Sequence, residues 1–209
     1  MTTFVFIDAS NLFYGGVKSL GWRIDYQKLI NYLRGKYQIS QALYFGGVET
    51  HGFQHDYLNN ETVCLEELEK YLMCLIQKKK GHLNEEALKF MERHLQRVRF
   101  YLKLQTFGYR LHLKPVKWYN QNDGTAQKKA NCDVDMAFYL MKEADHFDRA
   151  VVLSGDGDFL PVLRYLRVIG KEIFVLARGE RTAREIRQFA GGNFRDFVRL
   201  EKYIKLTEK

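Results

Sequence analysis

Residues 150–159 read Ala150-Val-Val-Leu-Ser-Gly-Asp-Gly-Asp-Phe159, an apolar run that leads straight into two aspartates, Asp156 and Asp158. A run of this kind is typical of a buried parallel strand. The N-terminus repeats the pattern, because the apolar residues 4–7 lead into Asp8. A carboxylate at the carboxyl end of such a strand points into the crevice where open α/β sheets bind ligands. We therefore expect these three aspartates at one edge of one sheet.

The alternation of strand and helix patterns predicts an α/β fold with a central parallel sheet of about five strands, covered on both faces. The expected strands are rich in β-branched, aromatic or leucine residues and lie at 3–8, 41–48, 107–114, 149–154 and 171–177. Pro161 falls in the first turn of a helix expected from about 159 to 169, where a missing N–H costs little. A short edge strand is expected at 195–199, after which the chain should fray.

Residues 54–104 interrupt this alternation and predict an antiparallel helical hairpin inserted after the second strand. Apolar residues recur there at helical spacing in two stripes, Leu68, Tyr71, Leu72, Leu75 and Ile76, and then Leu88, Met91, Leu95, Val98 and Leu102. Asn84 is the expected N-cap of the second helix, and Lys78-Lys79-Lys80 is expected to be a solvated turn. We therefore expect one domain over 1–200, with 54–104 as an insertion and 201–209 as a C-terminal tail.

The composition limits which classes of protein this chain can belong to. The chain has 209 residues, 46% of them hydrophobic, which is enough for one large domain with a sizeable core. No apolar run approaches the ~20 residues that span a bilayer, so no membrane contact is expected. Three cysteines without paired spacing predict free thiols and a cytoplasmic protein. The formal net charge of +8 permits nucleic-acid binding without proving it.

A third acidic position lies in the middle of the chain. Asp133 opens the amphipathic stretch 133–141, and Asp135 follows two residues later. On a helix these carboxylates face different directions, and we expect Asp133 to point to the site and Asp135 to solvent or to the helix dipole. Several carboxylates that meet repel one another and stay ionised only if a cation neutralises them. An acidic cluster in a basic chain therefore predicts a divalent-metal site acting on a polyanion.

Each acidic motif also has a purely structural alternative. Asp158 could cap the helix that follows it, with Asp156 as a turn residue. Asp8, Ser10 or Asn11 could likewise cap the helix after the first strand. One cap residue is enough for each helix, so we favour additional roles, and Asn11 could orient Asp8 or contact a phosphate.

The glycines between the acids do not form a dinucleotide-binding fingerprint. The place of its third glycine is Leu160, and two aspartates in the turn would repel a pyrophosphate. A haloacid-dehalogenase-type phosphatase is disfavoured as well, because no second aspartate stands two residues after Asp8. Another metal-dependent phosphatase or a Toprim-type enzyme fits the order of the motifs less well.

Three segments together resemble the NYN domain family, the LabA-like branch of the PIN-domain nuclease superfamily. They are Phe6-Ile-Asp-Ala-Ser-Asn11, Lys129-Ala-Asn-Cys-Asp-Val-Asp135 and Val152-Leu-Ser-Gly-Asp-Gly-Asp-Phe-Leu-Pro161. The resemblance covers about 1–50 and 105–200 and implies a PIN-like three-layer α/β/α sandwich. The chain departs from the family at Tyr139, where another aspartate is frequent, and in the length of insertion 54–104.

The resemblance also implies a metal-dependent endoribonuclease that hydrolyses RNA phosphodiester bonds with Mg²⁺ or Mn²⁺ as its cofactor. It assigns catalytic and metal-binding roles to Asp8, Asp133, Asp156 and Asp158. The residues expected to bind substrate are Asn11, Ser154, Lys128 and Lys129, of which Asn11 and Ser154 would hold the phosphate or the ligating carboxylates. The expected partner is RNA, and a homodimer stays open. The alternative is a non-catalytic RNA-binding or regulatory module on a PIN-like scaffold, although a pure RNA binder has an electrostatic reason to lose the acids.

Overall fold

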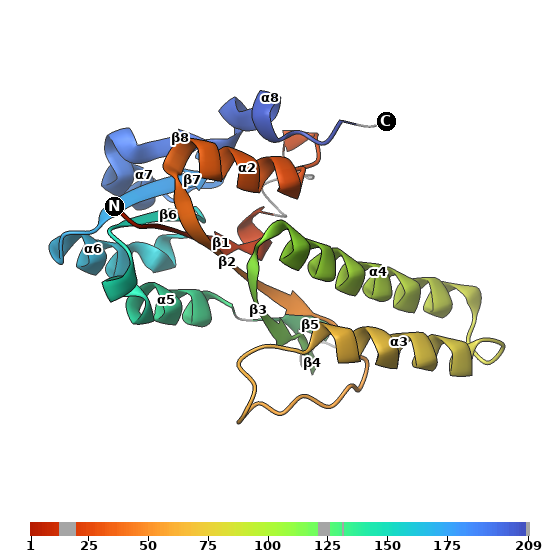
Figure 1. The fold of residues 1–209 in the computed structure, drawn as a ribbon. Helices are drawn as coiled ribbons and strands as arrows, with labels where there is room; N and C mark the ends of the chain where they lie inside the picture. Colours follow the sequence, from red (N-terminus) through yellow and green to blue (C-terminus); the bar gives the residue numbers. More distant parts are fainter. Residues whose placement is uncertain (13–19, 121–125, 131, 208–209) are drawn as a thin grey trace. The chain divides into compact units, whose positions relative to one another are not determined.

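The computed structural model describes residues 1–12, 20–120, 126–130 and 132–207, with the backbone alone at 118–120 and 126–129 (Figure 1). The described strands are β1 (Thr3–Asp8), β2 (Ile39–Val48), β3 (Arg110–Pro115), β4 (Lys117–Asn120), β5 (Ala126–Lys129), β6 (Arg149–Leu153), β7 (Glu172–Ala177) and β8 (Phe194–Asp196). The helices are α2 (Tyr26–Tyr37), α3 (Leu65–Lys79), α4 (Glu85–Phe107), α5 (Asp133–Lys142), α6 (Leu160–Val168), α7 (Arg184–Ala190) and α8 (Glu201–Ile204). Short 3₁₀ turns include η2 (Gly157–Phe159), η3 (Gly179–Arg181) and η5 (Phe197–Leu200).

The chain divides into two compact units. The first consists of Met1–Phe45, Phe107–Arg110 and Cys132–Lys209, and it contains β1, β6, β7 and β8 with the helices that cover them. The second consists of Gly46–Thr106 and Leu111–Asn131, and it contains α3, α4 and a two-stranded sheet of β4 and β5.

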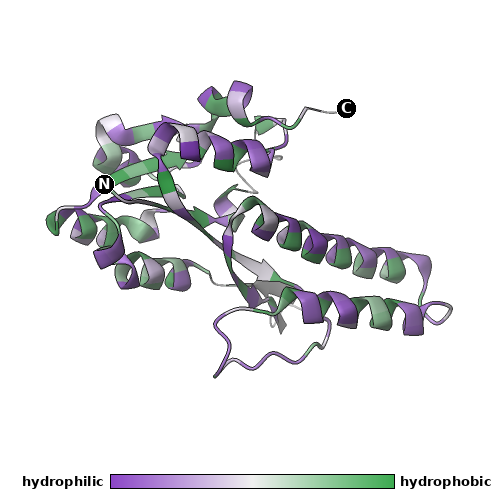
Figure 2. Ribbon diagram, viewed as in Figure 1, coloured by the Kyte–Doolittle hydropathy of each residue, from purple (hydrophilic) through white to green (hydrophobic). Residues whose placement is uncertain are grey.

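The larger sheet has the strand order β3-β2-β1-β6-β7-β8. β1 pairs in parallel with β2 on one side and with β6 on the other, and the β6–β7 and β7–β8 pairs are parallel as well. Every residue of β1 is buried. Burial on both faces explains why β1 and β6 are continuous apolar runs in the sequence, which Figure 2 shows in the hydrophobic colour.

Helices cover both faces of this sheet and give the predicted three-layer α/β/α fold (Figure 1). α5 and α6 contact each other on one face, while α2 and α8 contact each other on the other face. Phe147, after α5, packs against Phe4 and Phe6 of β1 with 5.6 Å between ring centres. Tyr37, at the end of α2, packs against Phe174 of β7 at 5.3 Å. The core of the first unit therefore lies on both sides of the central strands.

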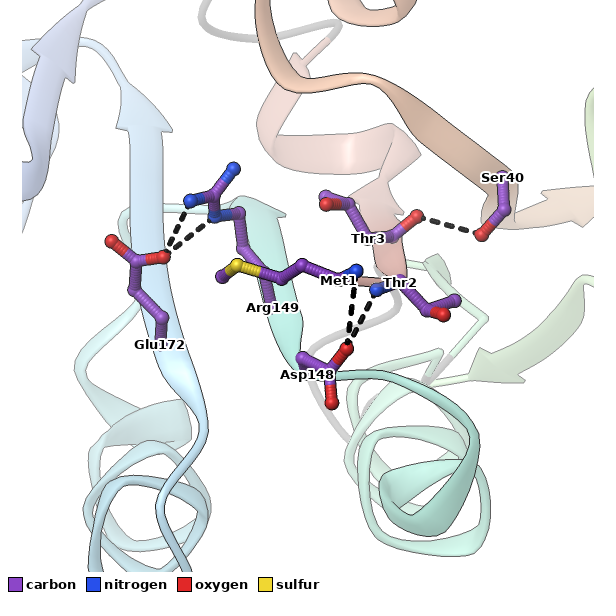
Figure 3. A network of polar contacts seen from close by, with 7 residues as sticks. All are labelled: Met1, Thr2, Thr3, Ser40, Asp148, Arg149 and Glu172. Atoms are coloured by element: carbon purple, nitrogen blue, oxygen red, sulfur yellow. Dashed lines mark hydrogen bonds and ion pairs between the residues drawn. The ribbon is translucent and has the colours of Figure 1, made fainter.

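A polar network closes the amino-terminal edge of the sheet (Figure 3). The Thr2 N–H donates a hydrogen bond to the Asp148 carboxylate at 2.7 Å, and the Met1 ammonium lies 3.9 Å from the same oxygen. Arg149 of β6 and Glu172 of β7 form an ion pair at 2.7 Å. Two ion pairs, Met1–Asp148 and Arg149–Glu172, therefore lie at this end of the strands.

α3 and α4 form the antiparallel helical hairpin that the sequence predicts (Figure 1). Leu72 of α3 and Val98 of α4 are fully buried. Asn84 caps α4, because its side-chain oxygen accepts a hydrogen bond from the Ala87 N–H at 2.9 Å. Residues 78–80 are exposed, as expected for a solvated turn.

Several element boundaries differ from the prediction. β3 begins at Arg110 rather than near 107, because α4 continues to Phe107. Residues 54–64 of the insertion precede α3 and are not helical. The hairpin of β4 and β5 was not predicted, since these short polar strands carry no apolar alternation. The larger sheet has six strands, because β8, the short edge strand expected near 195–199, adds to its edge beside β7.

The C-terminal segment also differs from the prediction. Only residues 194–196 form the edge strand, and residues 197–200 form η5 instead. Fraying after this strand is wrong for the described residues, because α8 follows and buries Ile204 completely. The Asp25 N–H donates a hydrogen bond to the Ile204 carbonyl at 2.8 Å. The segment therefore packs against the start of α2.

Among the described residues, no helix combines the length and the apolar character needed to cross a bilayer. Cys64, Cys74 and Cys132 are not joined in disulfide bonds, as predicted; the first two are exposed and the third is buried.

Candidate active site

The carboxyl ends of β1, β6 and β7 meet at one edge of the sheet. The parallel register aligns Ile7 with Leu153, so Asp8 and Ser154 follow side by side. β7 runs beside β6 and ends at Ala177. The strand order reverses at β1, because β2 lies on one side of it and β6 on the other. Open α/β sheets bind ligands outside the carboxyl ends of their strands at such a switch point.

A hollow with a volume of about 390 Å³ lies at this edge, within the first unit. Its lining comes from the end of β1, the start of α5, the turn after β6 and the loop after β7. The lining residues are Asp8, Ser10, Asn11, Asp133, Asp156, Arg178 and Arg181. The structure thus brings together three of the four predicted acids, Asn11 and two arginines.

Asp8 is the most buried acid of the hollow, with 4% of its surface exposed. Its Oδ1 accepts hydrogen bonds from the Ser10 N–H at 2.9 Å, from the Ser10 hydroxyl at 2.6 Å and from the Asn11 N–H at 3.2 Å. Its Oδ2 accepts a hydrogen bond from the Ser154 hydroxyl at 3.2 Å. These donors fix the orientation of the carboxylate, and Asp8 caps the helical turn at 9–12 as well as lining the hollow.

The turn after β6 connects the acids through Ser154. Its hydroxyl, in a residue only 2% exposed, donates to Asp8 and accepts a hydrogen bond from the Asp156 N–H at 3.3 Å. These contacts fit a role in holding the carboxylates rather than a direct contact with phosphate. Asp156 then caps η2 by accepting from the Asp158 N–H at 3.0 Å. The alternative in which Asp158 is the cap is therefore wrong, and Asp158 is exposed outside the lining of the hollow.

α5 places its first residue, Asp133, in the lining of the hollow. Asp135 is half-buried and does not line it, which agrees with the different directions of two residues spaced two apart on a helix. Tyr139, where the family often has an aspartate, is 4% exposed and packs against Phe45 with 5.6 Å between ring centres. Position 139 therefore contributes to the core in this chain.

The loop after β7 supplies two lining residues that the sequence reasoning did not assign to the site, Arg178 and Arg181. Arg178 directly follows the last residue of β7, so the signal used for the aspartates, a polar residue after an apolar strand, also applied to it. Arg184 and Arg187 belong to the same basic segment and do not line the hollow. Spacing alone could not separate the two pairs.

The two arginines are a second source of positive charge in the hollow, besides a metal ion. A guanidinium group beside a carboxylate supplies the positive charge that the sequence argument assigned to a cation alone. The described residues contain no group of three or more His, Cys, Asp or Glu side chains placed to hold one metal ion directly. The donors still suit Mg²⁺ or Mn²⁺, because such ions bind through one or two carboxylates and keep several waters.

Lys128 and Lys129, predicted to bind substrate, lie in β5 of the second unit. Their side chains lie outside the described residues, and their role stays a prediction.

The fold and the acids at its switch point define a PIN-like, nuclease-type domain. Residues 2–197 match the model of the NYN domain, and the chain belongs to this family, which confirms the resemblance. The chain is 23% identical to the Low amplitude and bright protein LabA of Synechococcus elongatus over 209 residues, covering 98% of this chain and 88% of LabA. It also resembles the crystal structure of a protein of unknown function from Vibrio parahaemolyticus, with a TM-score of 0.61 and 16% identity over 98% of this chain and 96% of that chain. The second likeness supports the fold alone.

Proposed function

We propose that this protein is a metal-dependent endoribonuclease that hydrolyses RNA phosphodiester bonds at the hollow. The observation that carries the proposal is the meeting of Asp8, Asp133 and Asp156, from three separate elements, at the switch point of the sheet. Membership of the NYN family, with its PIN-like nuclease-type fold, supports it. The net charge of +8 supports a polyanionic substrate.

The lining residues divide into ligands and supports. Bound Mg²⁺ or Mn²⁺ would polarise the scissile phosphate and lower the pKa of an attacking water. Asp133 and Asp156 would offer oxygen ligands to the ion. Asp8, whose carboxylate is held by four hydrogen bonds, would orient the other carboxylates of the site. Asn11 would contact the substrate, and Ser154 would keep Asp8 in place.

Asp158 needs a separate role because it lies outside the lining. Its exposed carboxylate on η2 would bind a second ion or order a water at the rim. Lys128 and Lys129 would contact the RNA backbone through their charge.

One observation favours a second candidate, a non-catalytic RNA-binding or regulatory module. Arg178 and Arg181 line the same hollow as the acids, so the acids have positive neighbours even without a metal ion. Because the arginines can compensate the charge of the acids, the presence of the acids does not by itself require that the protein is an enzyme.

Substitution of Asp156 by Asn separates the two candidates. Asn caps a helix about as well as Asp does, so the turn at η2 should persist. The change removes a negative charge that repels phosphate, so RNA affinity should stay equal or rise. Cleavage of mixed RNA in Mn²⁺, followed on gels against an EDTA control, should fall by at least about a hundredfold, because a ligand that stabilises the transition state is lost.

Asp145→Asn is the matched control, because Asp145 is exposed and does not line the hollow. It should cleave like the wild type. The nuclease proposal fails if the wild type shows no metal-dependent cleavage while its RNA binding is salt-sensitive and unaffected by Asp156→Asn. The non-catalytic module then takes its place.

A further inference from the structure

Arg178 has hydrogen-bonding capacity that the described residues leave unused. Its Nη2 donates to a Glu180 carboxylate oxygen at 2.8 Å, and this glutamate side chain is 81% exposed. The Nε and Nη1 atoms are buried and have no hydrogen-bond acceptor among the described residues. Buried N–H groups of a cation are costly to leave without an acceptor. The residue nevertheless lines the hollow, where a bound anion would compensate its charge.

The backbone around Arg178 is held firmly in place. Its carbonyl accepts hydrogen bonds from the Arg181 N–H at 3.0 Å and from the Thr182 hydroxyl at 2.6 Å. Thr182 is 5% exposed and packs directly on Gly155. The Ala183 N–H donates to the Gly155 carbonyl at 2.9 Å. The loop that carries both arginines is therefore attached to the turn that carries the acids.

We propose that Arg178 and Arg181 form the phosphate-binding side of the hollow and hold an RNA phosphodiester beside the carboxylates. Three carboxylates alone would repel a phosphate, whereas guanidinium groups present planar donors that match phosphate oxygens. A consequence is that RNA binds at this site without a metal ion, which is needed only for cleavage. The assignment rests on the proposed function for the identity of the anion as RNA.

The test is binding of the full-length protein to fluorescein-labelled single-stranded RNA, measured by fluorescence anisotropy in EDTA over a series of NaCl concentrations. Arg178→Gln should weaken binding by at least about tenfold, because it removes charge-assisted hydrogen bonds. Arg181→Gln should weaken it in the same direction. In each variant the slope of log affinity against log salt should become shallower by about 0.7, the value for one lost contact with single-stranded RNA.

Two control variants come from the same segment. Arg187→Gln removes one exposed positive charge outside the hollow and should leave the salt slope unchanged. Glu180→Gln removes the described ion-pair partner of Arg178 and should keep or tighten RNA binding. A merely structural role of Arg178 would instead make Glu180→Gln weaken binding as Arg178→Gln does.

The proposal is overturned if both arginine variants behave like Arg187→Gln, if Glu180→Gln reproduces the loss, or if the wild type binds RNA only in Mn²⁺. Circular dichroism checks the fold, and Arg181→Gln, at an exposed position, carries the test if Arg178→Gln unfolds. If the wild type never cleaves RNA but the arginine variants lose RNA binding, this assignment is supported and the nuclease proposal is refuted. If both arginine variants bind and cleave RNA normally, this assignment is refuted and the nuclease proposal is supported.

Discussion

At the scale of single residues, Asp8 shows that capping a helix and lining a site are compatible. Its Oδ1 caps the turn at 9–12 while the residue lines the hollow. Asp156 does the same, because it caps η2 and lines the hollow. The structural and functional interpretations of these two acids therefore do not exclude one another. Asp158 differs, since it neither caps a helix nor lines the hollow.

Tyr37 gives a prediction at the same scale. Burial raises its pKa to about 12, and its hydroxyl has no hydrogen-bond partner among the described residues. Below about pH 10 the phenol is protonated in both states, but at higher pH the unfolded chain ionises first. The free energy of unfolding should therefore fall as the pH rises from about 10 to about 12. Tyr37→Phe should reduce this alkaline loss and change stability at pH 7 by under about 0.5 kcal/mol.

Urea unfolding of both proteins at pH 7 and in the alkaline range measures this effect. Tyr165→Phe, at a side chain that is 49% exposed, controls for removal of a hydroxyl. An alkaline loss as large in Tyr37→Phe as in the wild type would contradict the assignment to Tyr37.

At the scale of elements, the turn after β6 and the loop after β7 fit together through glycines. A Cβ at Gly155 would lie 2.7 Å from the Thr182 Oγ1 and 2.9 Å from its Cα. A Cβ at Gly157 would lie 2.5 Å from a Glu185 carboxylate oxygen. Gly155 therefore allows the loop with the arginines to approach the turn that carries the acids, and Gly157 allows α7 to approach the same turn.

Gly155→Ala should separate these two elements. The added methyl group meets backbone atoms that cannot rotate away, so the variant should lose about 1–3 kcal/mol of stability. RNA binding in EDTA should weaken in parallel, because the loop carries Arg178. Gly192→Ala is the control, since a Cβ at Gly192 meets nothing within 4 Å. Equal urea midpoints for the two variants would show that the turn and the loop are not tightly packed.

At the scale of the whole molecule, the amino-terminal and carboxyl-terminal ends of the strands in the central sheet carry different kinds of polar groups. At the amino edge, Asp148, Arg149 and Glu172 pair with neighbouring groups (Figure 3). At the carboxyl edge, acids and arginines line a hollow. The second unit adds a helical hairpin whose connecting lysines are exposed.

The exposed lysines of the hairpin should be dispensable for folding. Replacing Lys78, Lys79 and Lys80 by Ser should change the free energy of unfolding by under about 0.5 kcal/mol, since exposed side chains contribute little. Urea denaturation of the triple variant checks this. A large loss of stability would mean that the turn is packed. A loss of RNA affinity with a shallower salt dependence would instead place the turn in the binding surface.

Metal binding should be visible in the stability of the native protein. An ion that binds the folded chain and not the unfolded one raises the melting temperature. Mn²⁺ should therefore raise the melting temperature of the wild type in differential scanning fluorimetry, and Asp156→Asn should remove most of that rise. A metal response that is unchanged in Asp8→Asn, Asp133→Asn and Asp156→Asn would rule out the proposed site.

Several features of this protein follow from the sequence alone because they depend on local patterns. Burial on both faces makes β1 and β6 continuous apolar runs, so their positions were predicted within one residue. Helical periodicity likewise located α3 and α4, and a side-chain cap located the start of α4. The short polar strands β4 and β5 have no such pattern and were missed.

The grouping of Asp8 and Asp156 was predictable as well, because parallel strands bring their carboxyl ends to one edge whatever lies between them in the sequence. Asp133 joins them from the first residue of α5 and not from the end of a strand. Only the tertiary structure shows that Asp158 lies outside the hollow and that Arg178 and Arg181 lie inside it. The reason is physical. The placement of the two arginines depends on how the loop after β7 packs on Gly155, and a contact between residues far apart in the chain leaves no periodic trace in either segment.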